Sequence, residues 1–239
     1  MHYWNKANFK GLKEIAEALR HKSGYEGYAR YCLLREKGLK KEALVELRSF
    51  IDQSRILPVD EQRAMASELA EMHFYNRDIH QFFPQPAAAY VGDVLQKWCD
   101  ESPRSPEPYR WSGVVCGNSE LFERALREDP EDEISLSRLV LQELQSVDFA
   151  THHLSESVFL GPESEADEAL AKAVAYAIRL PVNELKTRHM EEIEYYRSLL
   201  SAWREYRGGS RQKPFPEWSA EHGHKFSFGS VVYYGGGQT

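Results

Sequence analysis

The sequence predicts an all-α fold of stacked antiparallel helix pairs, followed by a short irregular or single-strand tail at the C-terminus. Three observations favour this fold class. Apolar residues recur at helical spacing along most of the 239 residues. Proline and glycine clusters interrupt these stripes where helix-to-helix connections are expected. Alternation typical of a strand is confined to KFSFGSVVYY, residues 225–234.

The N-terminal helical part is predicted over residues 1–102. Its first helix has one apolar face, with Asn8 available near the start. Residues 23–53 are typical of a helical hairpin in which Gly38 ends the first helix in a left-handed conformation. A further helix is predicted from about Asp60 towards Asn76, and an apolar stripe then predicts another over residues 90–98.

A Pro-rich connection is predicted over residues 103–109, where three prolines prevent helix continuation and favour extended backbone. Such a segment can separate two subdomains or join two layers of one stack. We expect the second arrangement, because neither half of the chain has a distinct composition.

The C-terminal helical part is predicted over residues 110–209. Its strongest helix signal is GPESEADEALAKAVAYAIRLP, in which Pro162 suits the first turn and acidic residues lie near the N-terminal end. A long helix should follow from about Val182 to Arg207, where two glycines end it. The tail, residues 210–239, is expected to pack on the same domain, to pair with a second chain or to be ordered by a partner.

Two segments resemble the tetratricopeptide repeat, a helix–turn–helix unit of 34 residues. Gly38, Ala43 and Leu47 match its pattern, although Phe50 stands where alanine is usual. In LFERALREDP, residues 121–130, a phenylalanine, an alanine and the final proline match. The resemblance covers about a third of the chain and implies stacked helix pairs whose concave face binds peptides or proteins. A compact irregular helical bundle without a groove is the alternative.

The net charge of −7, with a pI near 5.8, argues against nucleic acid as a partner and is compatible with a basic protein partner. Such acidity is also ordinary for cytosolic proteins. Three widely spaced cysteines form no CxxC pair, which favours reduced thiols over a disulfide framework or a zinc site. The sequence shows no apolar run of signal-peptide or membrane-spanning type, so we expect a cytoplasmic protein without membrane contact.

The segment DFATHHLSES, residues 148–157, has the highest density of reactive side chains. Asp148, His152 and Glu156 follow one another at i, i+4 spacing and could share a helix face, which would favour a metal site together with His153 and His224. The following LGP indicates instead that the helix ends before Glu156. We therefore interpret the segment as a polar helix end whose histidines contact neighbouring helices, with no catalytic residue, metal or cofactor.

These patterns predict a non-enzymatic, protein-binding module, and more specifically a bacterial immunity or antitoxin-like protein that neutralises a basic partner. A metal-dependent hydrolase using Asp148, His152 and His153 is one alternative, and a peptide-binding scaffold or chaperone is another. The oligomeric state stays open. The candidate binding residues are aromatic, acidic and imidazole side chains near predicted helix ends: Tyr109, Trp111, Asp129, Glu131, Asp132, His152 and His153.

Overall fold

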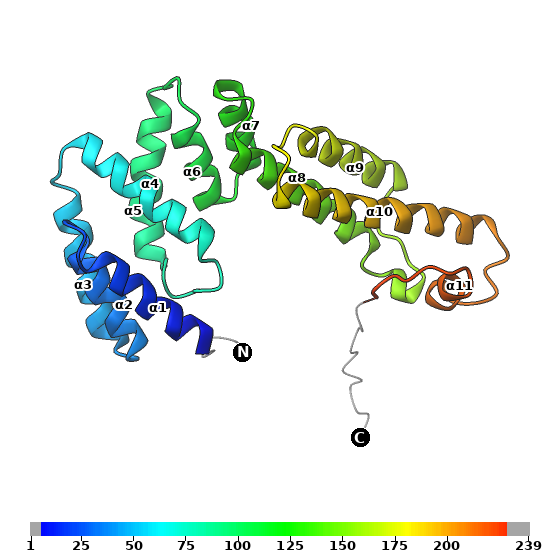
Figure 1. Cartoon of the computed structure of the whole chain (residues 1–239), viewed down its shortest axis with the longest axis horizontal. Helices are drawn as coiled ribbons and strands as arrows, with labels where there is room; N and C mark the ends of the chain where they lie inside the picture. The colour runs from blue at the N-terminus through cyan, green and yellow to red at the C-terminus, as the bar shows by residue number, and fades with distance from the viewer. Residues whose placement is uncertain (1–5, 229–239) are drawn as a thin grey trace. The chain divides into compact units, whose positions relative to one another are not determined.

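The all-α prediction is confirmed by the computed structural model, which describes residues 6–228 (Figure 1). Over this range the chain forms eleven α-helices and one short 3₁₀ helix, without a strand. The chain divides into two compact units, the first ending at Pro130 and the second beginning at Glu131. The first unit contains α1 (Lys6–Leu19), α2 (Glu26–Glu36), α3 (Lys40–Ser54), α4 (Val59–Tyr75), α5 (Gln85–Asp100), α6 (Glu107–Cys116) and α7 (Ser119–Glu128). The second contains α8 (Glu133–Thr151), η1 (Leu154–Glu156), α9 (Glu163–Ala177), α10 (Glu184–Gly208) and α11 (Phe215–Glu221).

The boundary between the units, at residues 130–131, does not coincide with the Pro-rich connection over residues 103–109. That Pro-rich connection lies inside the first unit, where it joins α5 to α6. Its prolines do end α5, but Pro108 is also accommodated in the first turn of α6. Because α5 and α6 then pack against each other, the break in the helix makes no break in the core.

In the first unit, successive helices pack against one another from α1 to α3 and from α4 to α7, and α3 also contacts α5. Buried side chains fix the connection between α4 and α5. The Tyr28 and Tyr31 hydroxyls donate to the carbonyls of Phe82 and Gln81, at 2.8 and 2.5 Å. The Gln81 amide donates to Asn8 Oδ1 at 3.3 Å. Asn8, considered above for the start of a helix, is thus a buried tie to a distant loop.

The predicted hairpin over residues 23–53 is formed by α2 and α3. Gly38 has a φ of 78°, the left-handed conformation expected at the end of a helix. Ala43 and Leu47 are fully buried, and Phe50 packs edge-on against Tyr28 with ring centroids 5.2 Å apart. Of the positions that carry the resemblance to the tetratricopeptide repeat in this hairpin, Ala43 and Leu47 are therefore core positions, whereas Gly38 is exposed at the turn. Membership of that family stays a prediction.

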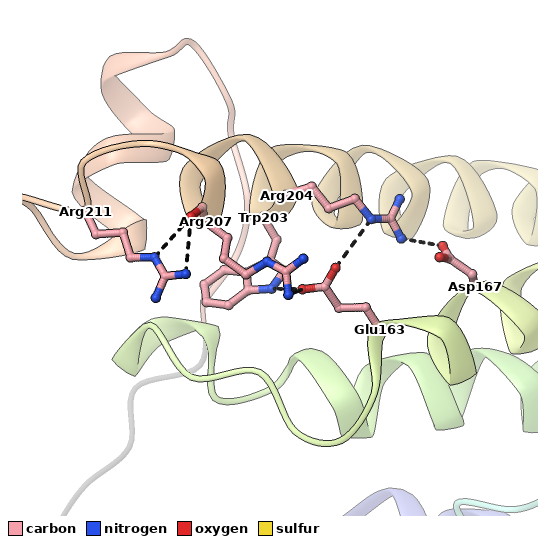
Figure 2. Close-up of polar contacts among 6 residues, drawn as sticks. All are labelled: Glu163, Asp167, Trp203, Arg204, Arg207 and Arg211. Carbon is pink, nitrogen blue, oxygen red and sulfur yellow. Dashed lines mark hydrogen bonds and ion pairs between the residues drawn. The ribbon is translucent and has the colours of Figure 1, made fainter.

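The core of the second unit is shared by α8, α9 and α10, each of which packs against the other two. The alanine-rich face of α9 is buried there, as its periodicity predicts. The acidic first turn of α9 is tied to the last turns of α10 (Figure 2). Trp203 Nε1 and Arg207 Nη1 both donate to Glu163 Oε1, at 3.0 and 2.9 Å. Arg204 Nη2 donates to Asp167 at 2.5 Å.

The tail folds back onto the helices of the second unit as far as it is described, to residue 228. The Phe215 amide donates to Ser157 Oγ at 2.7 Å, which places α11 beside η1. Phe226 and Phe228 then pack against the buried core, both in ring contact with Phe215. Residues 225–228 do not form a strand, and the remainder of the predicted strand lies outside the described residues.

Candidate binding site on the second unit

Helix α8 ends within DFATHHLSES, as predicted. Its last residue is Thr151, His152 is the C-cap, and a 3₁₀ turn runs from Leu154 to Glu156. Ser157 follows with a φ of 60°, in the left-handed region, and closes that turn. Because α8 ends at Thr151, His152 and Glu156 do not share a helix face, although they are four residues apart.

The histidines of this segment make local contacts, where we had predicted contacts between neighbouring helices. His152 Nδ1 lies 2.6 Å from the Phe149 carbonyl oxygen, so this nitrogen is a donor. His153 Nδ1 lies 2.9 Å from Glu156 Oε1. The physical reason is that the chain turns sharply after α8, which brings the imidazoles back onto their own segment.

The residues considered for a metal site do not gather. Asp148 accepts a hydrogen bond from the Tyr196 hydroxyl at 2.9 Å, whereas His153 is engaged by Glu156. His224 stacks on Phe226, with ring centroids 5.1 Å apart. Across residues 6–228, no three His, Cys, Asp or Glu side chains are grouped suitably to hold a metal ion.

The predicted aromatic binding residues lie in the core of the first unit. Tyr109 and Trp111 are 1% and 3% exposed, respectively. The Tyr109 hydroxyl donates to the Pro103 carbonyl at 3.3 Å, and Trp111 packs edge-on against Phe74. Both rings therefore act in packing, and neither is available on the surface.

The predicted acidic binding residues are divided between the two units. Asp129 is the C-cap of α7 in the first unit, and Glu131 is exposed at the start of the second. Asp132 is the N-cap of α8 and is only 4% exposed, since its carboxylate accepts from the Ser135 amide at 2.9 Å. Asp132 thus has a structural role that the charge pattern alone did not reveal.

Two adjoining hollows on the second unit are lined by three of the candidate residues, Asp148, His152 and His224. The first, which we call the Asp148 hollow, has a volume of about 260 Å³ and lies between α8, α10 and the tail. The second, which we call the His224 hollow, has a volume of about 580 Å³ and lies between α10 and the tail. The side chain of Tyr195 lines both. The Asp148 hollow is lined by Asp148, Thr151, His152, Tyr195, Tyr196, Leu199, Ser227 and Phe228. The His224 hollow is lined by Glu191, Glu194, Tyr195, Ser198, Gly223, His224, Lys225 and Phe226.

Three hydroxyl protons of the Asp148 hollow are directed at protein acceptors. Tyr196 donates to Asp148, Thr151 Oγ1 donates to the Val147 carbonyl at 2.9 Å, and Tyr195 makes a long contact of 3.5 Å to the Ser227 carbonyl. His152 Nδ1 likewise faces a backbone acceptor, the Phe149 carbonyl oxygen. These four side chains therefore direct their protons at the protein and offer a ligand mainly lone pairs.

Negative charge concentrates where α8 and α10 face each other beside this hollow. The pKa of the Glu192 carboxyl is raised, first by its partial burial and then by the charge of Asp148. Burial, the hydrogen bond to Asp148 and the charges of Asp148 and Glu192 likewise raise the pKa of Tyr196. Neither Asp148 nor Glu192 forms an ion pair with a basic side chain in the described part of the chain.

The acidity of the protein belongs almost entirely to the second unit. Residues 131–239 contain seventeen Asp or Glu and eleven Lys or Arg, a formal net charge of −6. Residues 1–130 contain twenty acidic and nineteen basic residues, a net charge of −1. The unit that contains the hollows is therefore also the unit whose charge favours a cationic partner.

Sequence reasoning missed the contribution of α10 to this site. The segment EEIEYY, residues 191–196, places three glutamates beside two tyrosines within the predicted long helix. The combination of clustered acid and aromatic residues could have identified it. Its pairing with Asp148 depends on the packing of α10 on α8, which no local pattern specifies.

Comparison with known proteins gives no match to a protein family, to a curated protein or to a solved structure. None of the helices between residues 6 and 228 combines the length and the apolar character that crossing a membrane requires. The site must therefore be interpreted from its own chemistry.

Proposed function

We propose that the protein is a non-enzymatic binding module whose second unit binds a basic protein partner. One observation carries this proposal. Asp148 and Glu192, on two packed helices, lie close enough for one charge to raise the other's pKa, and no basic side chain of the described chain forms an ion pair with either. Asp148 lines a hollow whose wall also includes Tyr195 and the tail residue Phe228.

Carboxylates without a basic partner beside aromatic side chains suit a surface that a protein partner covers more than one that stays in solvent. Two like charges repel each other, and a cation supplied by a partner converts the repulsion into attraction. Aromatic side chains add apolar contact area at low cost in side-chain entropy. The surface therefore supplies both an electrostatic term, which steers association, and a packing term, which holds the complex.

A more specific form of the proposal is an immunity or antitoxin-like role, in which the chain blocks a basic toxin in a bacterial cytoplasm. The three cysteines, all free, are compatible with a reducing compartment. The resemblance of α2–α3 to a tetratricopeptide repeat adds a family whose members bind peptides or proteins. Neither feature identifies the partner, so the charge of the interface is the property to test first.

The test is affinity capture with the full chain as bait, followed by identification of any partner recovered in stoichiometric amount. The double charge reversal Glu191→Lys with Glu192→Lys is compared with a matched control, Glu165→Lys with Glu168→Lys. Both variants change the net charge equally, and the control glutamates are exposed residues of α9 outside both hollows.

We expect one basic protein to bind the wild type and the control, and to be lost from the α10 variant. Its affinity should fall as salt is added, because exposed charges are screened. Recovery of no partner, of an acidic partner, or of a partner held equally by both variants would contradict the proposal.

A further inference from the structure

We propose that the Asp148 hollow is the socket for an arginine side chain of the partner. This inference rests on the proposed function and adds the chemical identity of the group that anchors the complex. It is argued from three properties of the hollow: the direction of its hydrogen bonds, the planar side chain in its wall, and the carboxylate oxygen of Asp148 that is left for a ligand.

The first property is that the polar side chains of the hollow have lone pairs to offer but few protons. The Asp148 carboxylate and the hydroxyl oxygens of Tyr195, Tyr196 and Thr151 are all acceptors after their internal bonds are counted. A complementary ligand must therefore be rich in donors. A guanidinium has five N–H donors and no acceptor, more than any other side chain.

The second property distinguishes arginine from lysine. Tyr195 lines both hollows and is half-buried, so part of its ring is open to a ligand. A planar guanidinium can lie against an aromatic ring and still direct its N–H groups sideways at acceptors. A lysine ammonium is a strongly hydrated point charge, which gains less from such a wall.

The third property is that a carboxylate in the wall of the hollow keeps an oxygen for a ligand. Asp148 belongs to α8 and receives the Tyr196 hydroxyl at one oxygen, Oδ1, which leaves Oδ2 for a ligand. Because a guanidinium is a fork, it can donate to this carboxylate and to a neighbouring hydroxyl oxygen at once, and such geometry is what makes Arg–carboxylate pairs specific.

The test measures binding of three capped tripeptides to the isotope-labelled full chain, by amide chemical shifts in NMR. The peptides are glycine-X-glycine in which X is arginine, citrulline or lysine. Citrulline retains the shape of arginine but lacks its charge, so the pair isolates the charge-assisted bonds. The protein variant is Asp148→Asn, which can still accept from Tyr196, and its control is Glu168→Gln, an equal loss of charge on α9.

We expect the arginine peptide to shift amides near residues 148–152 and 192–196. Citrulline should bind about 10-fold or more weakly, since it loses charge-assisted hydrogen bonds, and Asp148→Asn should weaken arginine binding to a similar extent. Lysine should bind more weakly than arginine, and Glu168→Gln should leave arginine binding unchanged. Circular dichroism of each variant establishes that it is folded.

Equal binding of arginine and citrulline, equal binding of arginine and lysine, or wild-type affinity in Asp148→Asn would each overturn the inference. If these results occur while a basic protein is still captured and still lost from the α10 charge reversal, the arginine socket is wrong and the proposed function stands. If the arginine peptide binds selectively but no basic protein is recovered, the proposed function fails and the socket remains as a site for another arginine-bearing ligand.

Discussion

Glu163 is the residue whose replacement gives the most discriminating test of how the second unit is held together. It lies in the first turn of α9, its side chain is 17% exposed, and it accepts from Trp203 and Arg207 on α10 (Figure 2). Two replacements separate its roles. Glu163→Ala removes the acceptor and the charge together, whereas Glu163→Gln removes the charge but keeps an oxygen for the indole.

The magnitudes follow from the exposure of each partner. Trp203 is 6% exposed, so loss of its acceptor leaves a buried N–H unsatisfied, at a cost of about 1–3 kcal/mol. The Arg207 side chain is 54% exposed, so that ion pair contributes only about 0.2–0.5 kcal/mol. A negative charge at the start of a helix adds about 0.3–1 kcal/mol. We therefore expect Glu163→Ala to lower the free energy of unfolding by about 2–3 kcal/mol and Glu163→Gln by about 1 kcal/mol.

Scanning calorimetry is the suitable assay, because the two units can unfold in separate transitions. For a unit of this size the transition should fall by about 10 °C in the alanine variant and about 4 °C in the glutamine variant. Glu165→Ala, an exposed residue in the same turn, is the control and should lose only the contribution of a negative charge at the helix start, about 0.3–1 kcal/mol. Equal losses for alanine and glutamine would refute the reasoning, since the charge and not the buried indole bond would then dominate.

Three further changes test the packing and the charges. Gly113→Ala should destabilise the first unit by about 1–2 kcal/mol in urea unfolding, since its Cβ would meet the Phe122 ring at 2.8 Å; Gly92→Ala, with ordinary contacts, should stabilise it by about 0.5–1 kcal/mol. Burial and a neighbouring arginine lower the pKa of His189, so the folded state binds fewer protons and stability should fall as pH drops below about 6.5; His189→Gln should flatten that profile. The pKa of Glu192 is raised, so its charge destabilises the free chain at neutral pH, and Glu192→Gln should raise the melting temperature slightly while weakening partner binding.

The helices were predictable because local signals specify them. The φ of Gly38, the start of α9 after Pro162 and the end of α10 near Gly208 all follow from residue chemistry that acts within one turn. The division into units was not predictable in the same way. The prolines at 103–109 interrupt a helix, but whether the core continues across them depends on contacts between α5 and α6 that no local pattern encodes.

The site was predictable only in part, for a related reason. DFATHHLSES was identified by its density of polar groups, and its helix does end where expected. The partners of Asp148 come from α10, 44 and 48 residues later, and from the tail. Tyr109 and Trp111 illustrate the converse, since an aromatic residue near a helix end looks the same in sequence whether the fold buries or exposes it.

Some carboxylates of the second unit are paired with a cation of the chain and others are not, and this contrast bears on function. Glu163 receives a buried indole and an arginine, which shows that this fold can neutralise an acidic group when the group has a structural role. Asp148 and Glu192 receive no such cation in the described chain, and their mutual repulsion is a cost that a single neutral substitution would remove. Such a loss of stability in the free chain is expected where the missing cation arrives with a partner. The same two charges then destabilise the free protein and strengthen the complex. A carboxylate that the fold itself pairs with a cation, as it does Glu163, would instead lose stability when neutralised, so the sign of the effect at Glu192 shows which of the two cases applies there.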